Sequence, residues 1–272
     1  MTVSDSLQRY LDRAGSEFQS PNLAFDEKWY RHRYPEVNQA VAAGVYRCGW
    51  EHYLSEGAKK QYNPVAWFDE TWYLFRSSDA AQGVKCGALL CGFEHYLLYG
   101  IRQELAPSIY FSPAWYNKIT GAPGQGHGTY SIVQYLLAAE NSRPVPVAFF
   151  DGPWYRTRYL GGPSDLPSIP EPFQHYLFYG RSCGFSPSPK FNEMAYREAH
   201  PEAAAKIAAG VYSSAFEHYA TEGVLEGMVA PTHLETSGVD YAGPEFLPNY
   251  EYSVRVNFRQ LALLRELAQT TR

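Results

Sequence analysis

A pair of short motifs recurs five times along this 272-residue chain and constrains its fold more than any other feature. The first motif has the form Phe-Asp-Glu-x-Trp-Tyr and opens at Phe25, Phe68, Phe111, Phe150 and Phe191. The second has the form His-Tyr-Leu-x-x-Gly and follows each copy of the first. Successive opening phenylalanines are 43, 43, 39 and 41 residues apart, and a period in this range is typical of repeat architectures. We call each pair of motifs, with the residues up to the next opening Phe, a cassette.

The first motif predicts the start of a helix. The residue after the opening Phe is a favoured N-cap type in every cassette: Asp26, Asp69, Ser112, Asp151 and Asn192. Its side-chain oxygen can accept a hydrogen bond from a free backbone N–H of the first helical turn. Because Ser and Asn replace Asp, a carboxylate is not required, which favours capping over acid catalysis. The aromatic residues that follow, expected to pack between helices, are Trp29, Trp72, Trp115, Trp154 and, in the fifth cassette, Tyr196.

The second motif predicts a further helix with a histidine at a fixed position. The residues at that position are His52, His95, His175 and His218, with Gln134 in the third cassette. Gln can hydrogen-bond a backbone carbonyl as imidazole does, but it is a poor ligand for transition metals. The substitution therefore favours a structural tether over a metal or catalytic role. The glycines of this motif predict the helix ends, since prolines follow them: Gly57, Gly100, Gly180 and Gly223.

Between the two motifs, some cassettes predict another helix. These runs are Val37 to Ala43 and Ala203 to Ala209, each preceded by Pro-Glu and ended by Gly44 or Gly210. The matching regions 121–128 and 161–172 are rich in Gly and Pro, so loops are expected there. No sustained alternation of apolar and polar residues predicts strands.

The predicted fold is therefore all-α, an array of about five repeats of ~41 residues, each with two to three short helices. Residues 1–20 hold Leu7-Gln8-Arg9-Tyr10-Leu11, a partial repeat expected to cap the array. The array itself occupies residues 21–231. Residues 232–272 are expected to form a linker and an amphipathic C-terminal helix from Tyr252 to Gln269.

Sequence patterns for catalysis and cofactors are missing. The glycine-rich run 121–128 matches neither nucleotide-binding fingerprint, and no metalloprotease or nucleophile-elbow motif occurs. Cys48 and Cys91 occupy equivalent places in adjacent repeats, too far apart for a disulfide if the repeats stack. We therefore expect free thiols, no metal site and no cofactor.

Charge and hydropathy limit the partners. The formal net charge is −5, so no global positive field attracts nucleic acid. No apolar stretch is long enough to span a bilayer. We expect a cytoplasmic protein that is peripheral to the inner membrane only through its partners.

The cassette pattern Phe-Asp-x-x-Trp-Tyr, then Pro-Glu-Val, then His-Tyr-Leu-x-x-Gly resembles a family of bacterial repeats. Such repeats stand beside glycosyltransferase domains of surface-polysaccharide synthesis and in some secreted repeat proteins. The resemblance covers about residues 21–231. It implies an accessory array, so no transferase residues carry over to this chain.

The expected function is a non-catalytic helical-repeat interaction or scaffold module. The resemblance implies that it is accessory to a glycosyltransferase or to cell-surface polysaccharide machinery, and that its partner is another protein or a catalytic domain on the same chain. The alternative is a carbohydrate-binding or glycan-processing protein that stacks exposed Trp and Tyr rings on sugars. Catalytic and metal-binding residues are expected to be absent in the leading interpretation.

Overall fold

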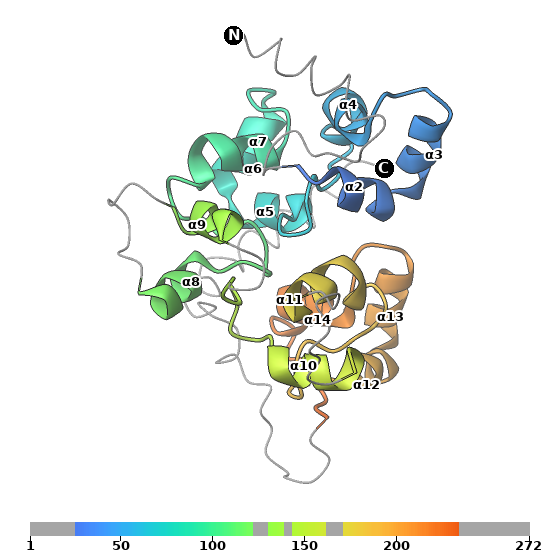
Figure 1. Ribbon diagram of the computed structural model, residues 1–272, viewed down its shortest axis with the longest axis vertical. Coiled ribbons are helices and arrows are strands. Elements are labelled where there is room, and N and C mark those ends of the chain that lie inside the picture. The colour runs from blue at the N-terminus through green and yellow to red at the C-terminus, as the bar shows by residue number, and fades with distance from the viewer. Residues whose placement is uncertain (1–24, 122–129, 139–142, 162–170, 234–272) are drawn as a thin grey trace. The chain divides into compact units, whose positions relative to one another are not determined.

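The computed structural model describes residues 25–121, 130–138, 143–161 and 171–233. Two compact units divide the chain, Met1–Pro146 and Val147–Arg272, and each is described by itself. Within the described residues the secondary structure is helical, apart from one isolated bridge between Ser108 and Phe111 (Figure 1). The predicted all-α class is confirmed.

The helices follow the cassettes in order. The first unit contains α2 (Glu27–Arg33), α3 (Pro35–Ala42), α4 (Gly49–His52), η1 (Tyr53–Gly57), α5 (Glu70–Arg76), α6 (Ser78–Lys85), α7 (Gly92–His95), η2 (Tyr96–Gly100), α8 (Pro113–Thr120) and α9 (Ser131–Leu137). The second contains α10 (Gly152–Tyr159), α11 (Pro172–His175), η4 (Tyr176–Gly180), α12 (Glu193–Ala199), α13 (Pro201–Ala208), α14 (Ala215–His218) and η5 (Tyr219–Gly223). The η elements are single π-helical turns that continue the preceding α-helix.

The predicted N-caps are confirmed in all five cassettes. Asp26 Oδ1 accepts a hydrogen bond from the Trp29 N–H at 2.9 Å, and Asn192 Oδ1 accepts one from the Ala195 N–H at 3.1 Å. Asp69, Ser112 and Asp151 make the same bond. A side-chain oxygen is therefore what this position requires, whether it belongs to a carboxylate, a hydroxyl or an amide.

Each capping residue also closes its cassette. Its backbone N–H donates to the carbonyl of a proline at the far end of the same cassette: Asp26 to Pro64, Asp69 to Pro107, Ser112 to Pro146, Asp151 to Pro187 and Asn192 to Pro231. These bonds are 2.7 to 3.3 Å long. The same closure in five places shows that each cassette returns the chain to the start of its own first helix.

The helices between the two motifs form where the sequence predicts them. Helices α3 and α13 are followed by Gly44 and Gly210, whose φ angles of 74° and 76° are left-handed. Cassette two has an equivalent helix, α6, which the sequence interpretation did not include. The loops predicted over 121–128 and 161–172, the cap over 1–20 and the segment 232–272 lie largely outside the described residues.

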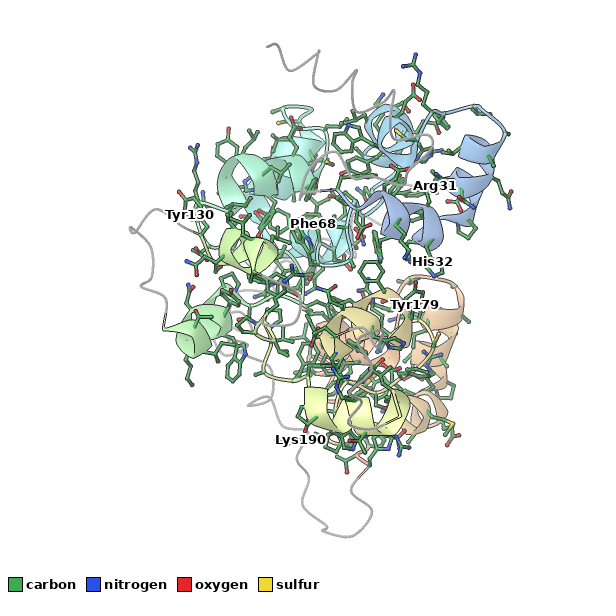
Figure 2. The ribbon with its side chains drawn as sticks, in the orientation of Figure 1. Arg31, His32, Phe68, Tyr130, Tyr179 and Lys190 are labelled. Carbon is green, nitrogen blue, oxygen red and sulfur yellow. The ribbon has the colours of Figure 1, made fainter. Side chains whose placement is uncertain are left out.

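Aromatic rings fill the core of each cassette. In cassette two, the ring centroid of Phe68 lies 4.8 Å from that of Phe93 and 5.3 Å from that of Tyr73, within the range of favourable edge-to-face contacts. Phe68 lies among the side chains of its unit (Figure 2). Trp29 is buried, as expected of core packing, but Trp72, Trp115 and Trp154 are only half-buried. The four cysteines are free thiols, as predicted.

Candidate functional site

The histidine of the second motif bonds to the tyrosine of the first. Nδ1 of His52, His95 and His175 lies 2.9 Å from Oη of Tyr30, Tyr73 and Tyr155 respectively, and the His218–Tyr196 distance is 3.1 Å. The first-motif helix positions the tyrosine, and the second-motif helix positions the histidine. The hydrogen bond therefore joins the two helices in these four cassettes.

The partner of the histidine differs from the prediction. A backbone carbonyl was expected, yet the structure places a phenol there in four cassettes. The tyrosine lies on the buried face of its helix and its long side chain reaches the imidazole across the cassette. The backbone carbonyls within a helix already accept hydrogen bonds from N–H groups of the same helix, so they are not free to bond to the imidazole.

The glycine of the second motif is also not the helix stop that the sequence predicts. The N–H of the next residue donates to the carbonyl five residues before it, as Ala58 does to Tyr53 and Ile101 to Tyr96, so the helix continues in a π turn. The left-handed residues come four positions after the glycine, at Gln61, Glu104, Gly184 and Gly227.

The tyrosine hydroxyl approaches the backbone so closely that the second motif requires a glycine at this position. A Cβ added at Gly57, Gly100, Gly180 or Gly223 would come within 3.0 Å of the Oη of the histidine's tyrosine partner. Real Cβ atoms do not make contacts that short. The Tyr–His hydrogen bond and the glycine are therefore one arrangement, in which the phenol crosses the π turn where only a hydrogen can fit.

The third cassette supports this interpretation, because it keeps the buried tyrosine, Tyr116, but has neither the histidine nor the glycine. Gln134 replaces the histidine, Ala139 stands at the glycine position, and helix α9 is α-helical to Leu137 with no π turn among its described residues. The replacement of His by Gln134 is therefore not an isolated substitution. It accompanies a different helix geometry.

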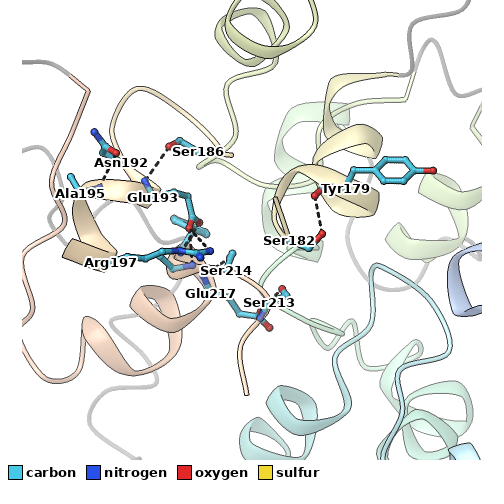
Figure 3. Close-up of polar contacts among 12 residues, drawn as sticks. Tyr179, Ser182, Ser186, Asn192, Glu193, Ala195, Arg197, Ser213, Ser214 and Glu217 are labelled. Atoms are coloured by element: carbon cyan, nitrogen blue, oxygen red, sulfur yellow. Dashed lines mark hydrogen bonds and ion pairs between the residues drawn. The ribbon is translucent and has the colours of Figure 1, made fainter. Parts of the chain in front are cut away.

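A buried glutamate forms the second polar contact of the cassette, and the sequence interpretation missed it. Glu27, Glu70 and Glu193 follow the capping residue and are 0 to 1% exposed. Each carboxylate accepts hydrogen bonds from the first two backbone N–H groups of the second-motif helix. Glu193 bonds to the N–H of Ala215 at 2.8 Å and of Phe216 at 2.9 Å (Figure 3). Glu27 bonds in the same way to Gly49 at 2.6 Å and to Trp50 at 3.1 Å.

Burial shifts the proton equilibria of these carboxylates. It raises the pKa of Glu70 from 4.5 to about 6 and that of Glu193 to about 7, although the backbone N–H groups act in the opposite direction. Arg197, whose Nη2 lies 3.6 Å from Glu193 Oε2, also favours the charged form of Glu193. Desolvation is the larger effect in both cases.

The third and fourth cassettes lack the glutamate at this position, each in a different way. In cassette four Gly152 stands at the glutamate position and Pro172, which has no N–H, stands at the start of α11. In cassette three Pro113 replaces the glutamate, and Glu104 supplies the carboxylate instead, accepting from the Ser131 N–H at 3.0 Å. The signal available in the sequence was the repeated Phe-Asp/Asn-Glu, together with the loss in cassette four of both the glutamate and the first N–H of the second-motif helix.

These histidines and glutamates make hydrogen bonds that join parts of the same cassette. Burial lowers the pKa of His52, His95, His175 and His218, which keeps them neutral at physiological pH. Their Nδ1 atoms contact a phenol, and the buried glutamates contact backbone N–H groups. Among the described residues no group of three His, Cys, Asp or Glu side chains could hold a metal ion.

Comparisons with known proteins found no match. No protein-family model, no curated protein and no solved structure matches this chain. Of the helices that the structure describes, none combines the length and the apolar character needed to cross a membrane.

Proposed function

We propose that this chain is a non-catalytic helical-repeat module that presents the outer faces of its second-motif helices to a protein partner. The proposal includes an accessory role beside a glycosyltransferase or surface-polysaccharide machinery, which rests on the resemblance of the cassette motifs. The partner is a separate protein or a catalytic domain on the same polypeptide.

The observation that carries the proposal is an apolar outer face on cassette two. Leu97, Leu98 and Tyr99 follow the buried His95 and Tyr96, and they are 42, 47 and 49% exposed. The Tyr99 ring contacts that of His95, with 5.3 Å between centroids, but each of these three consecutive apolar side chains leaves more than two fifths of its surface exposed. Exposed apolar patches are typical of protein interaction sites.

The positions of Leu98 and Tyr99 are polar in the first and fifth cassettes, whereas the position of Leu97 stays apolar. Ser55 and Glu56 replace Leu98 and Tyr99 in cassette one, and Thr221 and Glu222 replace them in cassette five. The apolar character is therefore not required by the cassette fold. Repeat proteins commonly bind partners with one face while the repeat cores remain alike.

A second candidate function is carbohydrate binding, favoured by exposed rings. Tyr99 is 49% and Tyr179 39% exposed, and tyrosine faces stack well on sugar rings. The half-buried Trp72 and Trp154 are less suitable, because Arg76 and Arg158 each lie over the indole ring at 5.6 Å from its centroid. The exposed tyrosines are the rings that a glycan would contact.

The test compares capture of partners by the parent protein and by Leu98→Ser from an extract of the source cells, with quantitative mass spectrometry. We expect Leu98→Ser to lose the enriched partner while keeping the parent melting temperature, since Leu98 contributes little to the core. The control is Val45→Ser, which changes a 67% exposed apolar residue elsewhere in the same unit and should keep the partner.

Equal capture by all three proteins would contradict the protein-binding proposal. Saturable quenching of Trp fluorescence by a soluble polysaccharide, lost in Tyr99→Ser, would favour the carbohydrate candidate instead.

A further inference from the structure

The first-motif helices of cassettes one to four place only positive charges at their surfaces. Helices α2, α5, α8 and α10 hold three, one, one and two Lys or Arg residues respectively. Their only acidic residues are Glu27 and Glu70, which are fully buried against backbone N–H groups. The surface charge of these four helices is therefore positive, although the formal net charge of the whole chain is −5.

In cassettes two to four one of these cations lies over a half-buried tryptophan of its own helix. The three pairs, with the distance from the cation to the ring centroid, are Arg76 over Trp72 at 5.6 Å, Lys118 over Trp115 at 5.7 Å and Arg158 over Trp154 at 5.6 Å. A cation is attracted to the face of an aromatic ring at such distances. Each ring therefore holds a positive charge at a defined place on its helix.

Two of these cations have no acidic partner. Neither Lys118 nor Arg158 forms an ion pair or a hydrogen bond with any other residue that the structure describes. Elsewhere in the chain, by contrast, Lys60 and Lys206 each bond to a glutamate. The N–H groups of Lys118 and Arg158 can therefore bond to an external anion without breaking a described contact.

An acidic sugar fits a cation held over an indole ring. A neutral sugar would have to displace the cation in order to stack on the ring. An acidic sugar can instead bond to the cation through its carboxylate, and its C–H groups can contact the part of the ring that is exposed.

Other anionic partners fit these helices less well. The centre of a protein interface is apolar, and no large apolar side chain of α2, α5 or α10 is exposed. Binding to nucleic acid depends on clustered cations that neutralise many phosphates, whereas α5 and α8 supply one cation each.

We propose that the cation–tryptophan pairs of cassettes two to four bind an acidic polysaccharide, with one sugar carboxylate at each cation. Cassette five has no such pair, because Ala195 stands at the tryptophan position. The pairs lie on the first-motif helices. This inference therefore rests neither on the protein partner of the second-motif helices nor on their exposed tyrosines.

The experiment is isothermal titration calorimetry of the full chain with alginate oligosaccharides, in which every sugar carries a carboxylate. The ionic strength is kept low because salt screens exposed ion pairs, and dextran oligosaccharides of equal length are the neutral comparison. The variant combines Lys118→Met with Arg158→Met, which removes two charges held over rings. The matched control combines Arg47→Met with Lys59→Met, which removes two exposed charges outside the first-motif helices.

The parent should bind alginate but not dextran, and the Lys118→Met, Arg158→Met variant should bind alginate about tenfold more weakly. The control should stay within about twofold of the parent. Both variants should keep the parent melting temperature, because all four substituted side chains are exposed.

An equal loss of affinity in both double variants would show an effect of net charge alone and would overturn the proposal. It would also be overturned if the parent did not bind alginate, or if it bound dextran equally well. Equally tight binding of poly-L-glutamate would assign these helices to an acidic polypeptide and would overturn it too. The second-motif helices are unchanged in every variant, so each of these results leaves the protein-binding proposal to its own test.

Discussion

At the scale of single residues, the recurring histidine is defined by what surrounds it. His95 is 6% exposed, its Nδ1 bonds to the Tyr73 hydroxyl, and burial lowers its pKa. A neutral imidazole with its Nδ1 atom engaged is suited to joining two helices. The same environment recurs around His52, His175 and His218.

Replacing His95 should therefore affect stability. We expect His95→Ala to lower the free energy of unfolding by about 1–4 kcal/mol, because it leaves a buried phenol without its partner and opens a cavity. His95→Gln should cost less, since the amide can still bond to the hydroxyl. Urea unfolding followed by circular dichroism measures both.

A chelator serves as the control for a metal role. The parent protein should melt at the same temperature with and without it. A chelator-dependent fall, or equal destabilisation by Ala and Gln, would contradict the structural role of the histidine.

How far the sequence predicts these residues depends on the range of each interaction. The N-caps were predictable because Asp26 contacts a backbone group only three residues away. The partner of His95 was not, since Tyr73 lies 22 residues away and the two are brought together only by the packed cassette. The role of Gly100 was not predictable for the same reason. In the sequence Gly100 resembles a helix end, and only the structure shows the Tyr73 hydroxyl that approaches it.

At the scale of elements, the first N–H of each second-motif helix is either bonded to a carboxylate or removed by proline. The first four N–H groups of a helix lack partners within it. In cassettes one, two and five these groups are buried, so the glutamate that binds two of them is buried as well. This contact fixes the position of the second-motif helix against the first.

Glu70→Ala should lower the free energy of unfolding by about 1–3 kcal/mol. The methyl group cannot accept a hydrogen bond, so the buried backbone N–H groups of Gly92 and Phe93 lose their partner. Chemical denaturation near pH 8, where the Glu70 carboxylate is charged, measures the difference.

The matched control is Glu226→Ala, which changes an exposed glutamate and should alter stability by less than about 0.5 kcal/mol. If Glu70→Ala is as stable as this control, the carboxylate does not hold the helix terminus.

At the scale of the whole molecule, the buried histidines and glutamates act in opposite directions on stability as pH changes. The folded state raises the pKa of Glu70 to about 6 and of Glu193 to about 7, from 4.5. Between pH 4.5 and 7 the folded state therefore binds more protons at these sites than the unfolded state, and their contribution to stability falls as pH rises. The histidines have lowered pKa values, so their contribution falls as pH drops below 6.5.

We therefore expect a stability maximum between about pH 5 and 7. Glu193→Gln should flatten the decline from pH 5 to 7, and His95→Gln should reduce the decline below pH 6.5. Denaturation midpoints measured across this range test both slopes. Profiles parallel to that of the parent in both variants would show that these groups titrate alike in the folded and unfolded states.

The central claim is that one contact, a phenol crossing a glycine in a π turn, holds each cassette that contains it. The most direct test is a double-mutant cycle in cassettes of different units: Gly57→Ala with Tyr30→Phe, and Gly223→Ala with Tyr196→Phe. In both places the phenol oxygen is the only atom within 3.0 Å of the added Cβ. Removing that oxygen should relieve the clash, so each glycine substitution should cost about 1–3 kcal/mol less in the Phe background. A coupling of that sign and similar size in both cassettes is the predicted result; a coupling near zero in either would contradict the account.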